Sequence, residues 1–279
     1  VPVYEVNADY VAEMARQMMV ERYQDAAYDS GFRVVTTLHR ADQEAANAAV
    51  RQGLLDYDRR HGYRGPEGQV DIPAKMANPD EELEDLLQDR EDSNGLVPAV
   101  VLSASPKRVK AFIKNRGPVD LSGDALAFAQ RSLGDKASKP IVRGSLIRVG
   151  KDAKGHWQIL QIPLAESALV SLVPGDGAIR ALVGGFDFDR SKFNHVIQAW
   201  RQPGSSFKPF IYSAALERGF TPASIINDAP ISLDPATTGG KLWEPKNFDG
   251  TYGGPTRMRM ALTKSKNLVS IRILQAIGT

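Results

Sequence analysis

Apolar residues recur at helical spacing in two segments near the start of the chain. The first, residues 7–23, follows an Asn-x-Asp start and predicts a helix. In residues 34–38 Val, Thr and Leu alternate, which predicts a strand, and a long helical pattern then runs to residue 61. A stripe of small and apolar positions on this second helix is expected to pack against another helix. The stripe comprises Ala45, Ala48, Ala49, Gln52 and Leu55.

The pattern breaks in residues 61–69, where three glycines and a proline predict a domain boundary. Residues 78–92 are acidic with leucines on one face, so they predict a short surface helix, with an interaction site as the alternative. Short apolar or alternating runs separated by Gly, Pro, Ser and Lys turns then fill residues 96–163. Such runs are typical of a small β-barrel or sandwich, and we expect an OB-like barrel.

Residues 167–188 carry a strong hairpin signal, because two apolar runs are joined by a Pro-Gly-Asp-Gly turn at 174–177. Both runs are largely apolar, so the hairpin is expected in the central sheet of a larger domain, with helices on either side. Residues 219–255, rich in Gly, Pro, Asp and Asn, predict long irregular loops. Helical periodicity then returns and leaves residues 265–267 on a turn between helices.

Composition narrows the range of functions. With 279 residues, 42% of them hydrophobic, the chain is long enough for a sizeable core and two domains. A net charge of +2 gives no reason to expect nucleic acid, and the predicted barrel offers only Phe112, Phe128 and Trp157 for base stacking. The chain has no cysteine for a disulfide or thiolate site, and its four histidines show no paired ligand spacing. We therefore expect no metal and no cofactor.

The candidate chemistry begins with Ser205 and Lys208, three residues apart where a helix is expected to start after Pro203 and Gly204. Residues three apart share a helix face, so a lysine held neutral by burial or by another cation can act as base for the serine hydroxyl. The alternative is a serine that caps the helix beside a surface lysine, since about one Ser-x-x-Lys is expected by chance in a chain of this length.

A single Ser-x-Asn triplet, Ser265-Lys266-Asn267, follows downstream and favours the catalytic interpretation. The two motifs occur together in penicillin-binding proteins and class A β-lactamases. We expect Lys266 to point to solvent. The alternative is that its positive charge helps to lower the pKa of Lys208.

Together the segments resemble the transpeptidase domain of class A, bifunctional penicillin-binding proteins of the Gram-negative type. The resemblance rests on the order of FRVVTTLHRADQEAA, GAIRALVGGFDF, RQPGSSFKPFIYSAAL and WEPKNFDGTYGGPTRMRMALTKSKN. Residues 71–163 resemble the inserted OB-like domain of the 1A group of that family. The resemblance implies an α/β (α+β) fold: a partial penicillin-binding transpeptidase/β-lactamase-like sheet with helices, plus the small inserted β-barrel.

The implied domains are residues 1–65, the linker and first elements of the transpeptidase domain; 66–163, the OB-like insert; and 164–279, the part with both motifs. The family's third motif, Lys-Thr/Ser-Gly, is expected well after Asn267 and does not occur before Thr279. Its strand would supply one amide of the oxyanion hole, and a single such donor contributes about 3 kcal/mol to transition-state stabilisation. We therefore expect this fragment to be inactive alone.

By resemblance, the longer protein is a serine DD-transpeptidase that cross-links peptidoglycan stem peptides ending in D-Ala-D-Ala. Ser205 is expected to attack the peptide and Lys208 to accept the proton of its hydroxyl. Ser265 would relay a proton to the leaving amine, and Asn267 would bind the substrate backbone or orient Lys208. β-Lactam antibiotics are expected to acylate the same serine.

Two other functions stay open. One is a D-alanyl-D-alanine carboxypeptidase or β-lactamase-type hydrolase of the same fold, in which water replaces the acceptor amine. The other is a non-catalytic module whose OB-like insert docks a regulatory protein, a partner that the transpeptidase interpretation also allows.

The resemblance also implies a place at the periplasmic face of the bacterial inner membrane, with a membrane helix and a glycosyltransferase domain outside this chain. No stretch approaches the roughly 20 continuous apolar residues of a membrane span. The first residue is Val1 rather than Met, so we expect an internal fragment whose anchor lies outside it.

Overall fold

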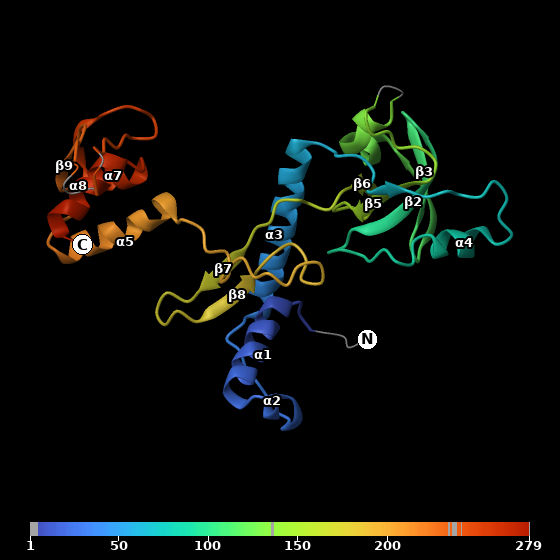
Figure 1. Ribbon diagram of the computed structural model, residues 1–279, viewed down its shortest axis with the longest axis horizontal. Coiled ribbons are helices and arrows are strands. Elements are labelled where there is room, and N and C mark those ends of the chain that lie inside the picture. The colour runs from blue at the N-terminus through green and yellow to red at the C-terminus, as the bar shows by residue number, and fades with distance from the viewer. Residues whose placement is uncertain (1–4, 135–136, 234, 236–238, 241, 279) are drawn as a thin grey trace. The chain divides into compact units, whose positions relative to one another are not determined.

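The computed structural model describes residues 5–134, 137–233, 235, 239–240 and 242–278 (Figure 1). The chain divides into two compact units, Val1–Ala199 and Trp200–Thr279. No helix in the described ranges is long and apolar enough to cross a membrane. The helices near the start of the first unit are α1 (Asp9–Tyr23), α2 (Ala26–Asp29) and α3 (Arg40–His61), so both long helices predicted there are confirmed.

The buried face of α3 differs from the predicted stripe. Ala45, Ala48 and Ala49 are exposed, whereas the buried face runs through Gln43, Ala46, Val50 and Leu54. Alanines occur on several sides of this helix, so their spacing alone does not determine which side packs. The stripe prediction was therefore wrong for all its alanines, and only its last member, the leucine at the end of the stripe, is buried.

The predicted hairpin is confirmed as β7 (Leu169–Leu172) and β8 (Ile179–Val183), which pair antiparallel. Helices α1 and α3 pack against it, as Figure 1 shows at the centre of the first unit. The side-chain amide of Gln43 on α3 accepts from the Leu182 N–H at 2.9 Å and donates to the Leu182 carbonyl at 3.0 Å. A helix side chain thus satisfies backbone groups that a neighbouring strand would otherwise use.

The strand expected at residues 34–38 is absent, and within the described residues the hairpin sheet has two strands. The segment lies along β8 but makes only scattered bonds: Thr37 Oγ1 donates to the Ile179 carbonyl at 2.8 Å, and the His39 N–H to the Arg180 carbonyl at 2.9 Å. Because Gln43 already occupies Leu182, the ladder does not extend. The alternating pattern was correct about proximity and wrong about strand pairing.

Residues 68–160, the middle part of the first unit's sequence, form an antiparallel sheet with the order β1-β5-β2-β3-β4. Strand β6 also pairs with β5. The OB-like barrel predicted for this segment is only partly formed: the strands make one antiparallel sheet, but within the described residues β4 and β6 do not pair, so the barrel is not closed. The 3₁₀-helix η1 contacts β3, β4 and β6, and so covers this gap. The elements are β1 (Gly68–Gln69), α4 (Pro79–Asp85), β2 (Val97–Ser105), β3 (Arg108–Ile113), β4 (Gly117–Ser122), η1 (Gly123–Ser132), β5 (Ser145–Lys151) and β6 (Trp157–Leu160).

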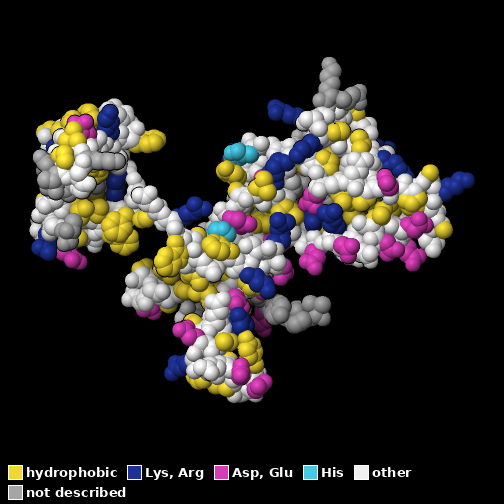
Figure 2. Space-filling model, viewed as in Figure 1, with side chains coloured by type: hydrophobic (Ala, Val, Ile, Leu, Met, Phe, Trp, Pro, Cys, Tyr) yellow, Lys and Arg dark blue, Asp and Glu magenta, His cyan; other side chains and the backbone are white. Residues whose placement is uncertain are grey.

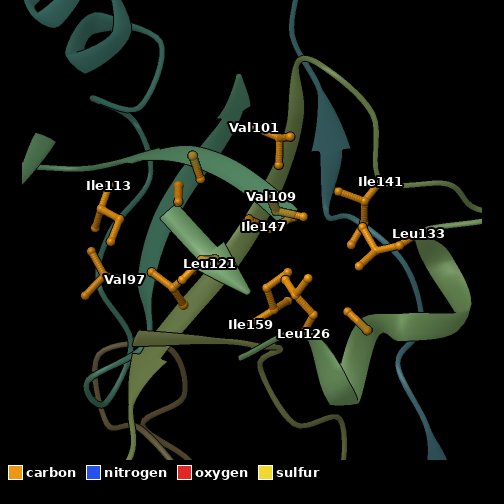
Figure 3. Packing of buried hydrophobic residues seen from close by; sticks show 14 residues of the cluster. Val97, Val101, Val109, Ile113, Leu121, Leu126, Leu133, Ile141, Ile147 and Ile159 are labelled. Atoms are coloured by element: carbon orange, nitrogen blue, oxygen red, sulfur yellow. The ribbon is translucent and has the colours of Figure 1, made fainter. Parts of the chain in front are cut away.

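The core of this sheet is filled by branched aliphatic side chains from its strands and from η1 (Figure 3). Leu126 of η1 lies beside Ile159 of β6 in that core, which also includes Leu121 of β4. On the other face, Leu83 of the acidic helix α4 and Leu87, which follows that helix, share a buried cluster with Phe112. Its acidic side chains gather at the surface on the right of Figure 2, so the predicted short surface helix is confirmed.

Within the described residues of the second unit, α-helices α5, α7 and α8 pack around a small core, with a short two-stranded sheet beside them. Helices α5 and α8 contact each other, and α7 contacts both. The core side chains are Tyr212, Ala215, Met258, Ala261, Val269 and Ile273. The elements are the 3₁₀-helix η2 (Gly204–Phe207), α5 (Lys208–Glu217), β9 (Ile225–Asp228), β10 (Gly254–Arg257), α7 (Met258–Thr263) and α8 (Asn267–Ile277).

Candidate active site

The start of α5 places Ser205 at the surface and Lys208 in the interior. Gly204 has φ +54°, a left-handed conformation that glycine adopts without a steric penalty, and the chain then enters η2. Pro209 lies in the first turn of α5, where its missing N–H needs no partner. Ser205 is exposed, whereas Lys208 is only 7% exposed. Neither helix start has a side-chain cap, so Ser205 does not cap the helix.

Four oxygen atoms lie within hydrogen-bond distance of the Lys208 ammonium nitrogen. Ser205 Oγ is 3.2 Å from Nζ and Ser265 Oγ is 2.9 Å from it. The Ser265 carbonyl lies at 2.6 Å and Asn267 Oδ1 at 2.7 Å. The structure thus brings all four candidate residues from the sequence to one point inside the second unit.

The chemical types of these four oxygens divide them into two pairs. The Ser265 carbonyl and Asn267 Oδ1 can only accept a hydrogen bond, whereas the two serine hydroxyls can also donate. A neutral amine has two N–H bonds and one lone pair. If its N–H bonds go to the two acceptors, the lone pair faces a serine hydroxyl, which is the arrangement a general base requires.

The surroundings of Lys208 favour that neutral form. Burial lowers the pKa of Lys208 from its ordinary value, because the charged ammonium loses hydration that the neutral amine needs less. Among the described residues no carboxylate contacts its amine, so no ion pair from them opposes this shift. A lysine with a lowered pKa beside an exposed serine is a nucleophile and base pair in geometry.

The turn between α7 and α8 presents both the carbonyl and the hydroxyl of Ser265 to Lys208. The Ser265 N–H donates to the Leu262 carbonyl at 2.9 Å, and the Lys266 N–H to the Ala261 carbonyl at 2.9 Å, which closes the end of α7. Ser265 has φ +52°, a left-handed conformation that few serines adopt. The predicted turn between helices is confirmed.

Asn267 is the first residue of α8, and its amide is held in one orientation. Its Nδ2 donates to the Lys246 carbonyl at 2.9 Å, which leaves Oδ1 to accept from Lys208. The backbone N–H of Asn267 donates to Asn247 Oδ1 at 2.8 Å. The loop before β10 therefore holds Asn267 by both its backbone and its side chain.

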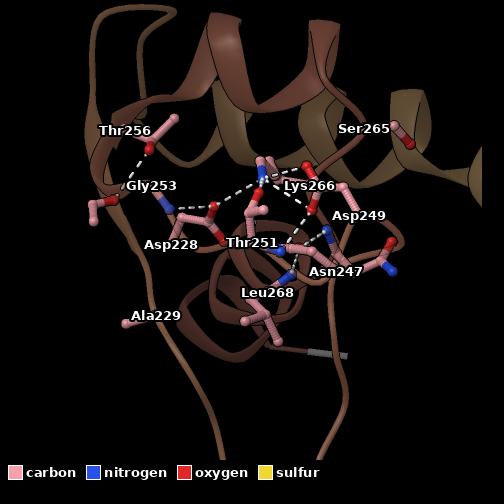
Figure 4. A network of polar contacts seen from close by, with 12 residues as sticks. Asp228, Ala229, Asn247, Asp249, Thr251, Gly253, Thr256, Ser265, Lys266 and Leu268 are labelled. Atoms are coloured by element: carbon pink, nitrogen blue, oxygen red, sulfur yellow. Dashed lines mark hydrogen bonds and ion pairs between the residues drawn. The ribbon is translucent and has the colours of Figure 1, made fainter.

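The expectation that Lys266 points to solvent was wrong. Its side chain is buried, and Nζ lies 3.4 Å from Asp228 Oδ2 and 3.0 Å from Asp249 Oδ2 (Figure 4). Thr251 also accepts from it through its hydroxyl at 3.2 Å. The aliphatic part of a lysine side chain can be buried when carboxylates meet its ammonium group, and the sequence does not show that these carboxylates lie near Lys266. The bond with Asp249 raises the pKa of Lys266.

A pocket of about 390 Å³ adjoins Ser205, Lys208 and Asn267. Its other lining is largely apolar and comes from η2, α5, α8 and the loop before β10, namely Phe207, Ile211, Trp243, Pro245, Ile271 and Leu274. Elsewhere in the described ranges, no group of three or more His, Cys, Asp or Glu side chains is placed to hold a metal ion.

Sequence reasoning missed the residues that hold the site from behind. Asp228 and Asn247 both lie in a region that its Gly, Pro, Asp and Asn content marked only as loops. Asp and Asn are ordinary turn residues, so their presence gave no signal of a structural role. A buried contact across 19 residues of chain, such as the one between Asn247 and Asp228, is visible only in the folded structure.

Comparisons with known proteins identify two family domains along the chain. Residues 63–165 match the penicillin-binding protein OB-like domain, and residues 168–279 match the penicillin binding protein transpeptidase domain. Penicillin-binding protein 1A of Pseudomonas aeruginosa is 46% identical over 282 residues, and that of Neisseria flavescens is 47% identical over 274 residues. Each alignment covers 98% of this chain and 34% of the relative, so the chain spans about a third of the length of these relatives.

The fold is also similar to a solved structure. A 2.6 Å crystal structure of penicillin-binding protein 1A from Haemophilus influenzae matches with a TM-score of 0.86 and 42% identity. The match covers 99% of this chain and 40% of that one. The likeness therefore extends over both units.

Proposed function

The chain belongs to the penicillin-binding proteins, with their OB-like domain and part of their transpeptidase domain, and from this we propose that Ser205 is the nucleophile of a serine-type D-Ala-D-Ala transpeptidase. The observation that carries the proposal is the contact of buried Lys208 Nζ with exposed Ser205 Oγ at 3.2 Å. The same amine also meets Ser265 and Asn267, the second motif. The activity is proposed for the longer protein that continues through the third motif.

In the acylation step, Ser205 Oγ bonds to the carbonyl carbon of the penultimate D-alanine as its proton moves to Lys208 Nζ. The C–N bond to the terminal D-alanine then breaks. The leaving amine takes up a proton from the Ser265 hydroxyl, which Lys208 replenishes across their 2.9 Å contact. The product is an ester on Ser205 and free D-alanine.

In the second step, the amine of a neighbouring stem peptide attacks the ester carbonyl and forms the cross-link. The Ser205 oxygen leaves and recovers a proton, with Lys208 again as the carrier. Asn267 orients Lys208 through Oδ1 in both steps. The third motif, beyond this chain, would complete the oxyanion hole, so the 279-residue chain alone is proposed to be inactive.

β-Lactams are proposed to acylate Ser205 by the same attack. The ring amide opens, the ester forms on the serine, and the leaving nitrogen stays attached to the antibiotic. The partners we propose are therefore D-Ala-D-Ala stem peptides and β-lactams, together with a regulatory protein on the OB-like domain. We also propose a place at the periplasmic face of the inner membrane, with the anchor in another part of the longer protein.

The test is the intact mass after incubation with a penicillin, for this chain and for a chain extended through the third motif. The proposal expects an adduct of the whole antibiotic mass on the extended chain, because no atoms leave. Ser205→Ala should abolish the adduct, and Ser206→Ala, the exposed neighbour, should retain it. A folded extended chain without a serine-dependent adduct would remove the proposal. Turnover with an added acceptor amine, compared with water alone, then separates a transpeptidase from a hydrolase of the same fold.

A further inference from the structure

A buried polar cluster lies behind the candidate site and joins four segments of the second unit. Asp228 at the end of β9 is 0% exposed, Asn247 in the following loop is 4% exposed, and Lys266 before α8 is 7% exposed. Polar groups buried this deeply cost free energy unless their partners are well placed. Each of the three side chains makes hydrogen bonds or ion pairs within the cluster, as Figure 4 shows.

Asp228 holds three partners with its two oxygens. Oδ1 accepts from Asn247 Nδ2 at 2.7 Å, and Oδ2 accepts from the Gly253 N–H at 2.9 Å. Lys266 Nζ lies 3.4 Å from the same Oδ2. The carboxylate thus holds three donors, the neutral amide of Asn247 on Oδ1 and the Gly253 N–H and charged Lys266 on Oδ2. These contacts fix the segments that carry the donors.

Asn247 connects Asp228 to the start of α8 through hydrogen bonds at both ends of its side-chain amide. Its Nδ2 also donates to the Thr251 carbonyl at 2.8 Å, so Oδ1 can only face the start of the helix. There it accepts from the N–H groups of Asn267 at 2.8 Å and Leu268 at 3.3 Å, two amides that have no partner inside the helix. The asparagine acts as a helix cap supplied from 20 residues earlier in the chain, because Lys266 at the cap position offers none.

The residue that this cap fixes is the one whose side chain meets Lys208. The carbonyl of Lys246, next to Asn247, takes the other end of the Asn267 amide at 2.9 Å. On the other side of the turn, the anchored Lys266 follows Ser265 directly, so the carbonyl of Ser265 is held at 2.6 Å from Lys208 Nζ. Both obligate acceptors of the Lys208 amine therefore depend on the buried cluster for their position.

From this geometry we infer that Asp228 and Asn247 are positioning residues, which hold Asn267 and Ser265 against Lys208 and keep water from its amine. The inference rests on the proposed function of Ser205. Neither residue lies among the partners of the Lys208 amine or the lining of the pocket beside it, so neither is a catalytic residue. Their effect passes through the first turn of α8.

The experiment compares Asn247→Ala with the matched control Asn227→Ala in the extended protein. Asn227 neighbours Asp228 on β9 and is exposed, so its loss removes an asparagine without touching the cluster. We expect Asn247→Ala to lower the rate constant for acylation by a penicillin roughly 10- to 100-fold, a usual effect of losing a partner that orients site residues. Asn227→Ala should acylate like the unaltered protein.

The pH profile distinguishes positioning from a general loss of stability. A loosened α8 start admits water to Lys208, so its pKa rises towards the ordinary value and the rise of rate with pH moves to higher pH. If Asn247 only stabilised the fold, its loss would lower the unfolding midpoint and leave the rising limb of the pH–rate profile at the same pH. If the alanine variant does not fold, Asn247→Ser, which keeps a short acceptor oxygen but loses the Nδ2 donor, is measured instead, and a smaller shift in the same direction is expected.

The possible outcomes separate the two ideas. A folded Asn247 variant with an unchanged rate and an unchanged limb would overturn the positioning role while Ser205 acylation stands. No Ser205-dependent adduct in the unaltered extended protein would overturn the proposed function, and the positioning role with it. A lower rate with a shifted limb, absent in Asn227→Ala, supports the inference.

Discussion

At the scale of single residues, exposure separates the two partners of the candidate catalytic pair. Ser205 is open to solvent, where a substrate carbonyl can reach it, while Lys208 is buried beneath it. Burial also lowers the pKa of Lys208, so the environment that suits it to the proposed role of base also hides it from solvent. The proposed nucleophile, Ser205, must therefore be exposed, whereas its proposed base, Lys208, must be buried.

This separation predicts how acylation depends on pH. The reaction needs the neutral amine, so its rate should rise with pH to a plateau, with a midpoint below 10.5, the ordinary lysine value. Lys208→Arg should lower the rate at least ~100-fold at every pH, because a guanidinium stays protonated. Rates of penicillin acylation between pH 5 and 10 on the extended protein measure both. A midpoint at or above the ordinary value, or an active arginine variant, would contradict Lys208 as base.

At the scale of elements, α3 shows how a helix can be predicted and its packing face mistaken. Ala46 is 4% exposed and packs with Ala181 and Val183 of β8, whereas Ala48 on the predicted stripe is exposed. In an alanine-rich helix, one step along the chain changes the face by about 100° with no change in residue type. Only the hairpin on the other side decides between the two alanines.

The two alanines give a direct test of the packing face. Ala46→Glu should lower the free energy of unfolding by about 3 kcal/mol, because it forces a carboxylate into the contact with β8. Ala48→Glu should change it by less than about 0.5 kcal/mol. Chemical denaturation of both variants measures the difference. Equal effects, or a larger effect at the second position, would favour the stripe predicted from the sequence.

Much of the fold was predictable because its signals are local. The helix starts, the Pro-Gly-Asp-Gly hairpin and the turn at residues 265–267 follow from residue types that act on their own neighbours. The two sequence motifs likewise identified Lys208 and the three side chains that meet it, Ser205, Ser265 and Asn267. The remainder depends on contacts between distant segments: the inward side chain of Lys266, the cap from Asn247, the open edge of the sheet covered by η1, and the use of Gln43 in place of a strand.

At the scale of the whole chain, the sheet of the first unit has a core of its own. All members of its main cluster, and those of the cluster under α4, fall within residues 63–165. A segment with a complete hydrophobic core can fold without the rest of the chain. We therefore expect the OB-like stretch, which is also a separate family match, to fold as a unit of its own.

We predict that residues 63–165 alone unfold in one cooperative transition. Leu126→Ala should lower its free energy of unfolding by about 2–5 kcal/mol, because this side chain of η1 is buried in the main core cluster. Leu164→Ala, at an exposed position, is the control and should shift it by less than about 0.5 kcal/mol. The absence of a cooperative transition, or equal shifts in the two variants, would argue against an autonomous core.

The left-handed backbone of Ser265 sets up a trade-off between stability and activity. A serine at φ +52° carries a steric cost on the order of 1 kcal/mol that glycine avoids, so Ser265→Gly should leave thermal stability unchanged or slightly raised. The same change deletes the hydroxyl 2.9 Å from Lys208 and should slow acylation. Stability therefore favours glycine at this position and catalytic activity favours serine. Measuring the unfolding midpoint and the acylation rate of Ser265→Gly would show the two properties change in opposite directions.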